Sequence, residues 1–139
     1  MDVRWIFLPA MAMVILVIAV MLRMVATRVG EMKRERIYPQ AVATSAQAVA
    51  RFGDTRAADN FRNLFELPVL FYVALLFATQ TGQVTLATLV LAWLFVALRA
   101  AHSFIQCTYN NVMHRFKVYL ASAAVLLSLW VCLAGSLFL

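Results

Sequence analysis

The stretch WIFLPAMAMVILVIAVML, from Trp5 to Leu22, decides the fold class of this chain. It contains no charged residue, and its length approaches the ~20 apolar residues with which an α-helix crosses a ~30 Å hydrocarbon layer. It is longer than the apolar core of a secretory signal, about 7–15 residues, and no clear small-residue cleavage site follows it. We therefore expect a transmembrane helix over residues 5–27.

The composition of the whole chain supports a membrane protein. Of its 139 residues, 65% are hydrophobic and 13% charged, whereas soluble domains are about 45–50% apolar and 25% charged. These values exclude an ordinary soluble domain, a disordered chain, collagen, a coiled coil and a disulfide scaffold. Four spans would use about 80 positions, and the remainder is too scattered for a second domain. We expect one integral membrane domain over residues 1–139.

Three further apolar runs predict an all-α bundle of four transmembrane helices. They cover residues 60–80, 85–105 and 115–138. The second helix should begin a turn or two before its apolar run, with Asp54 or Thr55 as N-cap. Pro68 then sits inside this helix, where it would leave the carbonyl of Leu64 without its usual donor and bend the axis.

The connections between the runs differ in length and charge. Residues 28–59 form a polar loop, and within it residues 41–52 predict a short helix whose buried face carries Val42, Val49 and Phe52 and which Gly53 would end. The segment CTYNNVMH, residues 107–114, predicts a tight turn around two asparagines that tolerate left-handed backbone.

The basic residues predict the orientation in the membrane. Seven Lys or Arg follow the first span and Arg115 and Lys117 follow the third, while the connection between the second and third spans has none. The positive-inside rule places loop 28–59 and the third connection in the cytoplasm and both termini outside. The net charge of +6 is thus a topology signal, and no soluble face exists to bind nucleic acid.

The sequence excludes several other kinds of site. Cys107 and Cys132 lie too far apart in this topology for a disulfide, so we expect two free thiols. No group of His, Cys, Asp or Glu has metal-ligand spacing, so no metal is expected. No phosphate-binding loop and no Ser-His-Asp arrangement is present either.

Polar side chains inside the spans are costly and each needs a reason. They recur at helical spacing on three spans: Arg62, Asn63 and Glu66; Arg99, His102, Ser103 and Gln106; and Arg115, Tyr119 and Ser122. In the expected topology all three stripes lie at the cytoplasmic end. The sequence therefore predicts a polar pocket that three spans share and that opens to the cytosol.

Simpler structural roles fit the same residues. Arg115 fits an interfacial anchor, and Glu66 fits a structural ion pair with Arg62 or Arg99. His102 fits a hydrogen-bonded core residue, and the tyrosines fit an aromatic belt.

The segments RNLFELP, residues 62–68, and RAAHSFIQCTYNNVMHRFKVY, residues 99–119, resemble the MAPEG family, the membrane-associated proteins of eicosanoid and glutathione metabolism. The resemblance extends over essentially the whole chain. It implies a homotrimer of four-helix subunits that binds glutathione between neighbours near the cytoplasmic face. A lipophilic small molecule would enter from the membrane lipids. We expect a multi-pass protein of the bacterial inner membrane.

The resemblance also implies a glutathione-binding set. Asn63 and Glu66 match the family's Asn-x-x-Glu, which holds the peptide part of glutathione, and Arg99 and His102 match its Arg-x-x-His. A carboxylate such as Glu66 can receive the ammonium of the tripeptide. Arg62 and Arg99 can clamp its carboxylates through paired N–H donors.

Arg115 and Tyr119 are the implied catalytic residues, because Arg115 matches the arginine beside the glutathione sulfur and Tyr119 the tyrosine four residues on. A thiol of pKa ~8.5 is only about 3% ionised at pH 7, and lowering that pKa by ~2 units raises the ionised fraction to roughly three quarters. The expected activity is a glutathione-dependent transferase or peroxidase acting on lipophilic electrophiles or lipid hydroperoxides.

Two departures from the family pattern favour an alternative, a non-catalytic lipid-binding or scaffold protein on the same fold. The family has an arginine where this chain has Asp59, with Arg56 one turn earlier, and a tyrosine in the neighbourhood of Gln106. A third class, a proton-coupled exporter, needs an acidic group within the membrane. Spans one, three and four lack one, and Glu66 lies near an interface.

Overall fold

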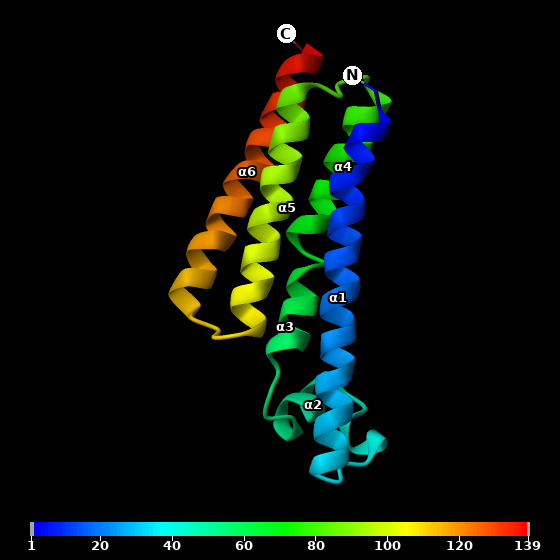
Figure 1. Cartoon of the computed structure of the whole chain (residues 1–139), viewed down its shortest axis with the longest axis vertical. Coiled ribbons are helices and arrows are strands. Elements are labelled where there is room, and N and C mark those ends of the chain that lie inside the picture. The colour runs from blue at the N-terminus through cyan, green and yellow to red at the C-terminus, as the bar shows by residue number, and fades with distance from the viewer. Residues whose placement is uncertain (1, 139) are drawn as a thin grey trace.

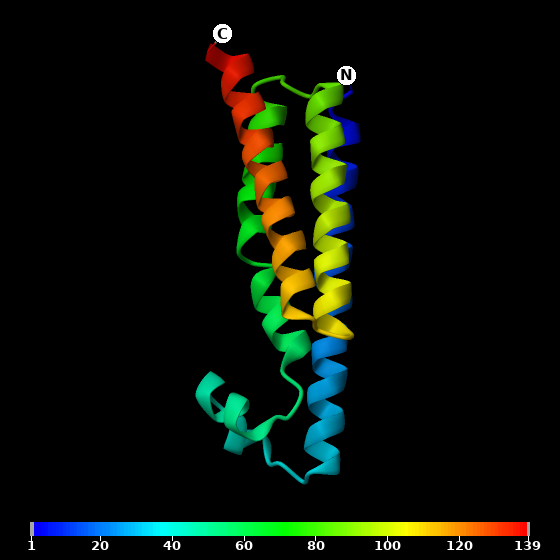
Figure 2. The same cartoon turned by 90° about the vertical axis from the view of Figure 1, so that its left-hand side faces the viewer.

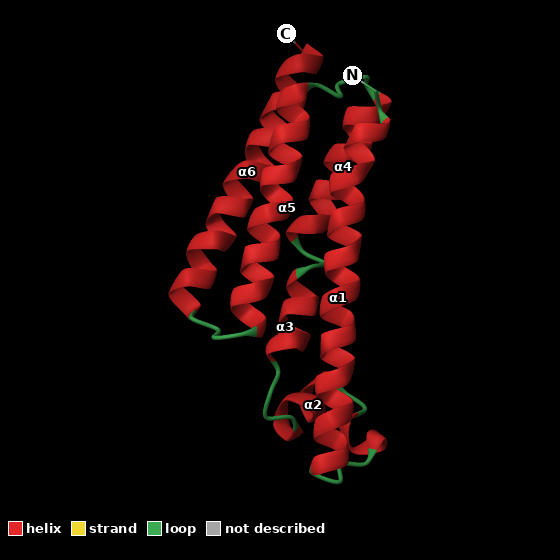
Figure 3. Ribbon diagram, in the orientation of Figure 1, coloured by secondary structure: helices red, strands yellow, loops and turns green. Residues whose placement is uncertain are grey.

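The structure is a computed structural model that describes residues 2–138, and within them it is helical with no strand (Figure 3). Its elements in chain order are α1 (Arg4–Arg34), the 3-10 helix η1 (Pro39–Val42), α2 (Ser45–Arg51), α3 (Arg56–Asn63), α4 (Leu67–Gln80), α5 (Leu86–Cys107) and α6 (Val112–Phe138).

Four helical segments are long and apolar enough to cross a membrane: α1, α3 with α4, α5, and α6. They lie along one axis, with both termini at one end of the bundle (Figure 1). Helix α1 has 31 residues, more than its apolar run predicted, because its polar last turns remain helical. These turns project beyond α5 and α6 at the end opposite the termini (Figure 2). The all-α membrane fold is confirmed.

The core between the helices consists of aliphatic side chains together with two stacked aromatic rings and several alanines. The rings of Phe71 and Phe95 stack with centroids 4.6 Å apart, and Ala74, Ala78 and Ala92 are fully buried around them. Such small residues let helix backbones approach closely, which is how helices associate in membranes. Many large apolar side chains remain exposed on the outer faces, which suits a surface in contact with lipid.

The second span is not the single helix expected over residues 60–80. Helix α3 ends at Asn63, and α4 begins at Leu67 with Pro68 in its first turn. Glu66 between them has φ −95° and ψ −98°, outside the helical region. The missing N–H and the ring of proline disrupt a helix interior but are tolerated in a first turn. Pro68 therefore breaks the helix where a bend was expected.

The loop after α1 is folded against that helix. Helix α2 begins with a capping box between Thr44 and Gln47. The prediction for its buried face was partly wrong: Phe52 is buried, but Val49 is 59% exposed and Ala48 takes its place. Gly53 follows the helix as expected. The reason for glycine at this position is the close approach of another side chain, since a Cβ there would lie 3.2 Å from the Glu31 carboxylate.

The remaining local predictions concern caps and cysteines. Thr55 is the N-cap of α3, although its hydroxyl bonds Asp59 and not the helix backbone. The turn between α5 and α6 has Asn110 at φ 47°, as its residue type predicted. Cys107 and Cys132 are both free thiols, as expected.

The Phe71–Phe95 stack generates a prediction about stability. Phe95→Ala should lower the free energy of unfolding by about 3–5 kcal/mol, because it removes buried contacts and leaves a cavity. Phe104→Ala on the same helix, where the ring is 65% exposed, should change it by less than about 0.5 kcal/mol. Thermal melting in detergent micelles compares the two, and equal losses would contradict this packing.

Candidate functional site

A polar cleft of about 250 Å³ opens where the second span breaks and α5 and α6 meet. Its lining contains five of the seven site residues predicted from the sequence: Asn63, Glu66, His102, Arg115 and Tyr119. Val112 and Phe116 complete the lining. The three polar stripes therefore do converge on one pocket.

The helix break places two of these residues. Asn63 is the last residue of α3 and Glu66 is the N-cap of α4, so two separate helix ends face the same cleft. The expected spacing of Arg62 and Glu66 on one continuous helix is lost. Within residues 2–138, Glu66 forms no ion pair with Arg62 or Arg99. Its exposed carboxylate is therefore available to bind a ligand.

Arg99 lies beneath the cleft with no solvent exposure. Its Nη2 donates to the carbonyl oxygen of Asn63 over 3.0 Å, and its guanidinium carbon lies 5.9 Å from the ring centroid of Tyr119. Its Nε and Nη1 have no hydrogen-bond partner in the described chain. Buried donors are nearly always paired in proteins, so unpaired ones call for an explanation such as an absent ligand or water.

Gln106 connects two residues of the cleft. Its Oε1 accepts from Nδ2 of Asn63 at 3.3 Å and lies 3.1 Å from Nε2 of His102. An amide oxygen can only accept, so this arrangement assigns the His102 proton to Nε2. Nδ1 of His102 is left buried without a partner among residues 2–138. Gln106, noted in the sequence as a departure, thus holds α3 and α5 together.

A second buried polar group, which the sequence did not single out, lies beside the first. Asn60 is fully buried; its Oδ1 accepts from the Ser103 hydroxyl at 3.2 Å and its Nδ2 donates to Cys107 Sγ at 3.4 Å. Asn60 precedes Asn63 by three residues, on the same face of α3. That spacing was the signal that could have revealed it.

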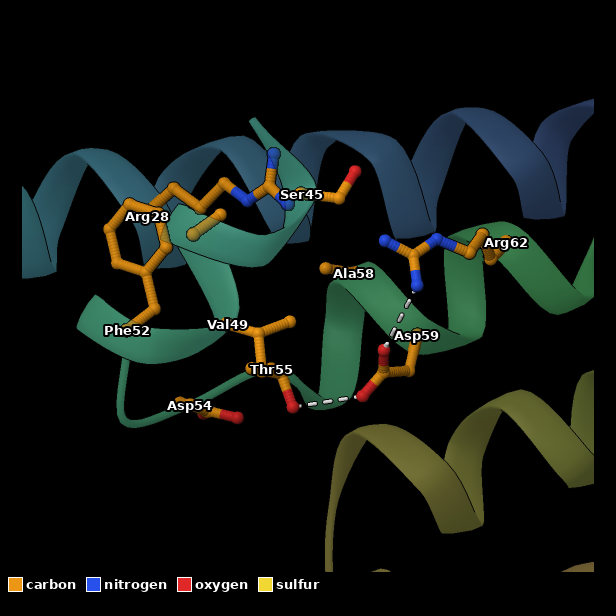
Figure 4. Close-up of a pocket in the computed structure, with 10 residues that line it drawn as sticks. Arg28, Ser45, Val49, Phe52, Asp54, Thr55, Ala58, Asp59 and Arg62 are labelled. Carbon is orange, nitrogen blue, oxygen red and sulfur yellow. Dashed lines mark hydrogen bonds and ion pairs between the residues drawn. The ribbon is translucent and has the colours of Figure 1, made fainter. Parts of the chain in front are cut away.

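Arg62 lies apart from the cleft. It lines a small pocket between α1, α2 and α3 with Arg28, and approaches Asp59 at 4.0 Å (Figure 4). Asp59 also accepts from the Thr55 hydroxyl. Arg62, which was expected to bind glutathione with the other site residues, is therefore not among the residues that line the cleft.

Arg56 does not replace the missing family arginine in this cleft either. Helix α3 begins at Arg56, but the side chain binds the Asp54 carboxylate at 2.8 Å and donates to the carbonyl of Thr108. The Arg56 side chain holds the pKa of Asp54 below its ordinary value through these hydrogen bonds. The pair remains ionised at neutral pH and ties the loop to the end of α5.

The charges of the cleft suit a small ligand that carries both positive and negative groups. Arg115 is half-buried at its rim, and Glu66 is the only carboxylate among the lining residues. The guanidinium of Arg115 and the carboxylate of Glu66 lie in the lining itself, whereas the guanidinium of Arg99 is buried beneath it and is not among the lining residues. No group of three metal-ligating side chains occurs within the described residues.

The bridging role of Gln106 can be tested. Gln106→Ala should lower the free energy of unfolding by about 1–3 kcal/mol, because it leaves the buried donor of His102 and the half-buried donor of Asn63 unpaired. Gln80→Ala, at an exposed position of α4, is the control and should be near neutral. If both variants melt in detergent at the wild-type temperature, the bridge does not stabilise the bundle.

Comparison with known proteins agrees with this architecture. The sequence model of the MAPEG family matches residues 6–135, almost the whole chain. No curated protein and no solved structure matches it. A multi-pass helical membrane protein with polar residues gathered at one end of its spans, this chain belongs to the MAPEG family.

Proposed function

We propose that this protein is a glutathione-dependent transferase or peroxidase that acts on lipophilic electrophiles or lipid hydroperoxides. One observation carries the proposal. The cleft gathers Asn63, Glu66, His102, Arg115 and Tyr119 from three spans, and Arg99 beneath it has two unpaired N–H donors. Membership of a family of glutathione and eicosanoid metabolism supports the same function.

Glutathione serves as co-substrate and its charges match the cleft. Its ammonium binds the free carboxylate of Glu66. One of its carboxylates binds the guanidinium of Arg99, whose N–H groups can donate more than one hydrogen bond to it. Asn63 and His102 complete the polar wall. The active form is a homotrimer, and Arg62, whose side chain is exposed at the small pocket between α1, α2 and α3, clamps the glutathione of a neighbouring subunit.

Arg115 and Tyr119 act on the sulfur. The positive charge of Arg115 favours the thiolate over the thiol, and the thiolate is the nucleophile. It attacks the electrophilic carbon of a lipophilic substrate and displaces the leaving group, or it attacks the terminal oxygen of a hydroperoxide and breaks the O–O bond. In the second case the sulfur is oxidised to a sulfenic acid and the alkoxide takes a proton from water and leaves as the alcohol. A second glutathione then reduces the sulfenic acid, which gives the disulfide and water. Tyr119 donates a hydrogen bond to the sulfur. The lipophilic substrate enters from the lipid, since the outer faces of the bundle are apolar.

The cleft end of the bundle faces the cytoplasm, and both termini lie outside. Residues 28–59, which contain six Lys or Arg, lie at that end of the bundle (Figure 1), in agreement with the positive-inside rule. The membrane is the bacterial inner membrane.

The role of Arg115 leads to a spectroscopic prediction. Glutathione added to the wild type in detergent should produce the ultraviolet absorbance of a thiolate at pH 7, and Arg115→Ala should abolish most of it. If the thiol pKa returns toward ~8.5, only about 3% remains ionised at that pH. Lys117→Ala, which removes an exposed cation two residues away on the same helix, should leave the signal unchanged. A wild type without the absorbance contradicts the proposal.

The second candidate is a non-catalytic lipid-binding or scaffold protein. It is favoured by Gln106, whose side chain is engaged in a structural bridge where the family has a hydroxyl donor.

Melting in detergent separates the two functions, because a ligand that prefers the folded state raises the melting temperature. Under the leading proposal, glutathione raises the melting temperature of the wild type. For the same rise, Glu66→Gln should need at least about a tenfold higher glutathione concentration, since a charge-assisted bond is lost. Glu35→Gln, at an exposed position of the α1 end, is the control. Stabilisation by phospholipid alone would favour the non-catalytic candidate.

A further inference from the structure

The turn between α5 and α6 holds the guanidinium of Arg115 through one side chain. Nη1 of Arg115 donates to Oδ1 of Asn110 over 2.7 Å, at the short end of the N–H···O range. Arg115 lines the cleft, whereas Asn110 is not among the lining residues. Asn110 therefore contacts the arginine and not the space that a ligand would fill.

The backbone of the turn does not by itself require asparagine. Asn110 has φ 47°, and its N–H donates to the carbonyl of Ile105 over 2.8 Å at the end of α5. Glycine adopts this left-handed conformation at no steric cost, and asparagine is one of the few other residues that tolerate it. The side-chain bond to Arg115 is what glycine could not supply.

The neighbouring asparagine has a separate task. Asn111 immediately precedes α6, and its Oδ1 accepts from the backbone N–H of His114 over 3.1 Å. This is the bond of a helix N-cap, which satisfies a free donor of the first turn. The two side chains thus divide the turn, one supporting the helix and the other supporting Arg115, and they form a matched pair for mutation.

The guanidinium of Arg115 is held by a hydrogen bond to a neutral amide, which does not compensate its positive charge. Arg115 lies in the first turn of α6, where the helix dipole does not favour a cation. Among the described residues it forms no ion pair. The titratable groups that share the cleft with it are Glu66, His102 and Tyr119. An amide oxygen can orient a guanidinium while leaving its full charge directed at the cleft, whereas a carboxylate would compensate that charge.

We propose that Asn110 is a positioning residue for Arg115: it fixes the guanidinium at the rim of the cleft and keeps its charge uncompensated, and so sets how much of a bound thiol is ionised. The inference rests on the proposed function, because the thiol is that of glutathione. Asn110 makes and breaks no covalent bond. The thiol proton passes to water, and the resulting thiolate is stabilised by the arginine.

The test compares Asn110→Gly and Asn110→Asp with the wild type, using the full chain in detergent with saturating glutathione. The pH midpoint of the thiolate absorbance should rise by about one unit in Asn110→Gly, a tenfold loss of thiolate well below the midpoint. It should rise at least as far in Asn110→Asp, because an added carboxylate disfavours a second anion. Asn111→Ala should lower the melting temperature and leave the midpoint unchanged.

The aspartate variant separates two roles of Asn110: one in which its neutral amide leaves the Arg115 charge uncompensated, and one in which only the hydrogen bond matters. Aspartate accepts the same hydrogen bond and tolerates the same backbone, so a structural role predicts a wild-type midpoint for Asn110→Asp. That result, or equal midpoints in all three proteins with glutathione bound, overturns the inference and leaves the proposed function standing. A wild type that binds no glutathione overturns both.

A second measurement tests the contact without glutathione. In protein labelled with 15N-arginine, the side-chain N–H signal of Arg115 is identified by its absence in Arg115→Ala. It should shift and sharpen in Asn110→Gly, where the side chain is released, and stay in place in Asn111→Ala. An unchanged signal in Asn110→Gly overturns the inference.

Discussion

A fully buried guanidinium within a membrane-spanning bundle is the constraint on which the site depends. A charge in such a position is costly unless polar groups surround it. The break before Pro68 supplies part of the answer. Because α3 stops at Asn63, the carbonyl of that residue receives only a long turn bond from the Glu66 N–H, over 3.4 Å, and it accepts a shorter bond from Arg99 at 3.0 Å.

The polar groups around this point fall into two layers with different properties. The inner layer, formed by Asn60, Ser103, Gln106 and His102, is buried and mostly hydrogen-bonded, and such networks hold elements in one arrangement. It keeps α3 and α5 in register. The outer layer, which includes Glu66 and Arg115, is accessible from the cleft. The inner layer builds the site, and the outer layer is free to meet a ligand.

Several features of the site were predictable because helical spacing is local. The stripe of Arg99, His102 and Gln106 was read from spacing alone, and α5 is indeed one uninterrupted helix. The Asn63–Glu66 pair was assigned to a common face of a helix that does not exist, yet both residues line the cleft because the two helix ends converge there. Val49 was expected to be buried but is exposed, and Arg62 was expected in the shared pocket but lies outside the cleft, since both depend on how neighbouring helices pack.

By itself, the sequence determined the membrane fold, the four spans and the membership of the family. These follow from the length and polarity of each segment, which are properties of the chain taken piece by piece. Only the tertiary structure decided that Pro68 divides a span, that Gln106 bridges Asn63 and His102, and that Asn110 holds Arg115. The last two depend on which partner a side-chain atom contacts, on another helix or across a turn, and spacing along one helix carries no information about such a contact. The first is local, but proline is compatible with either a bent helix or a broken one, and only the structure shows the break.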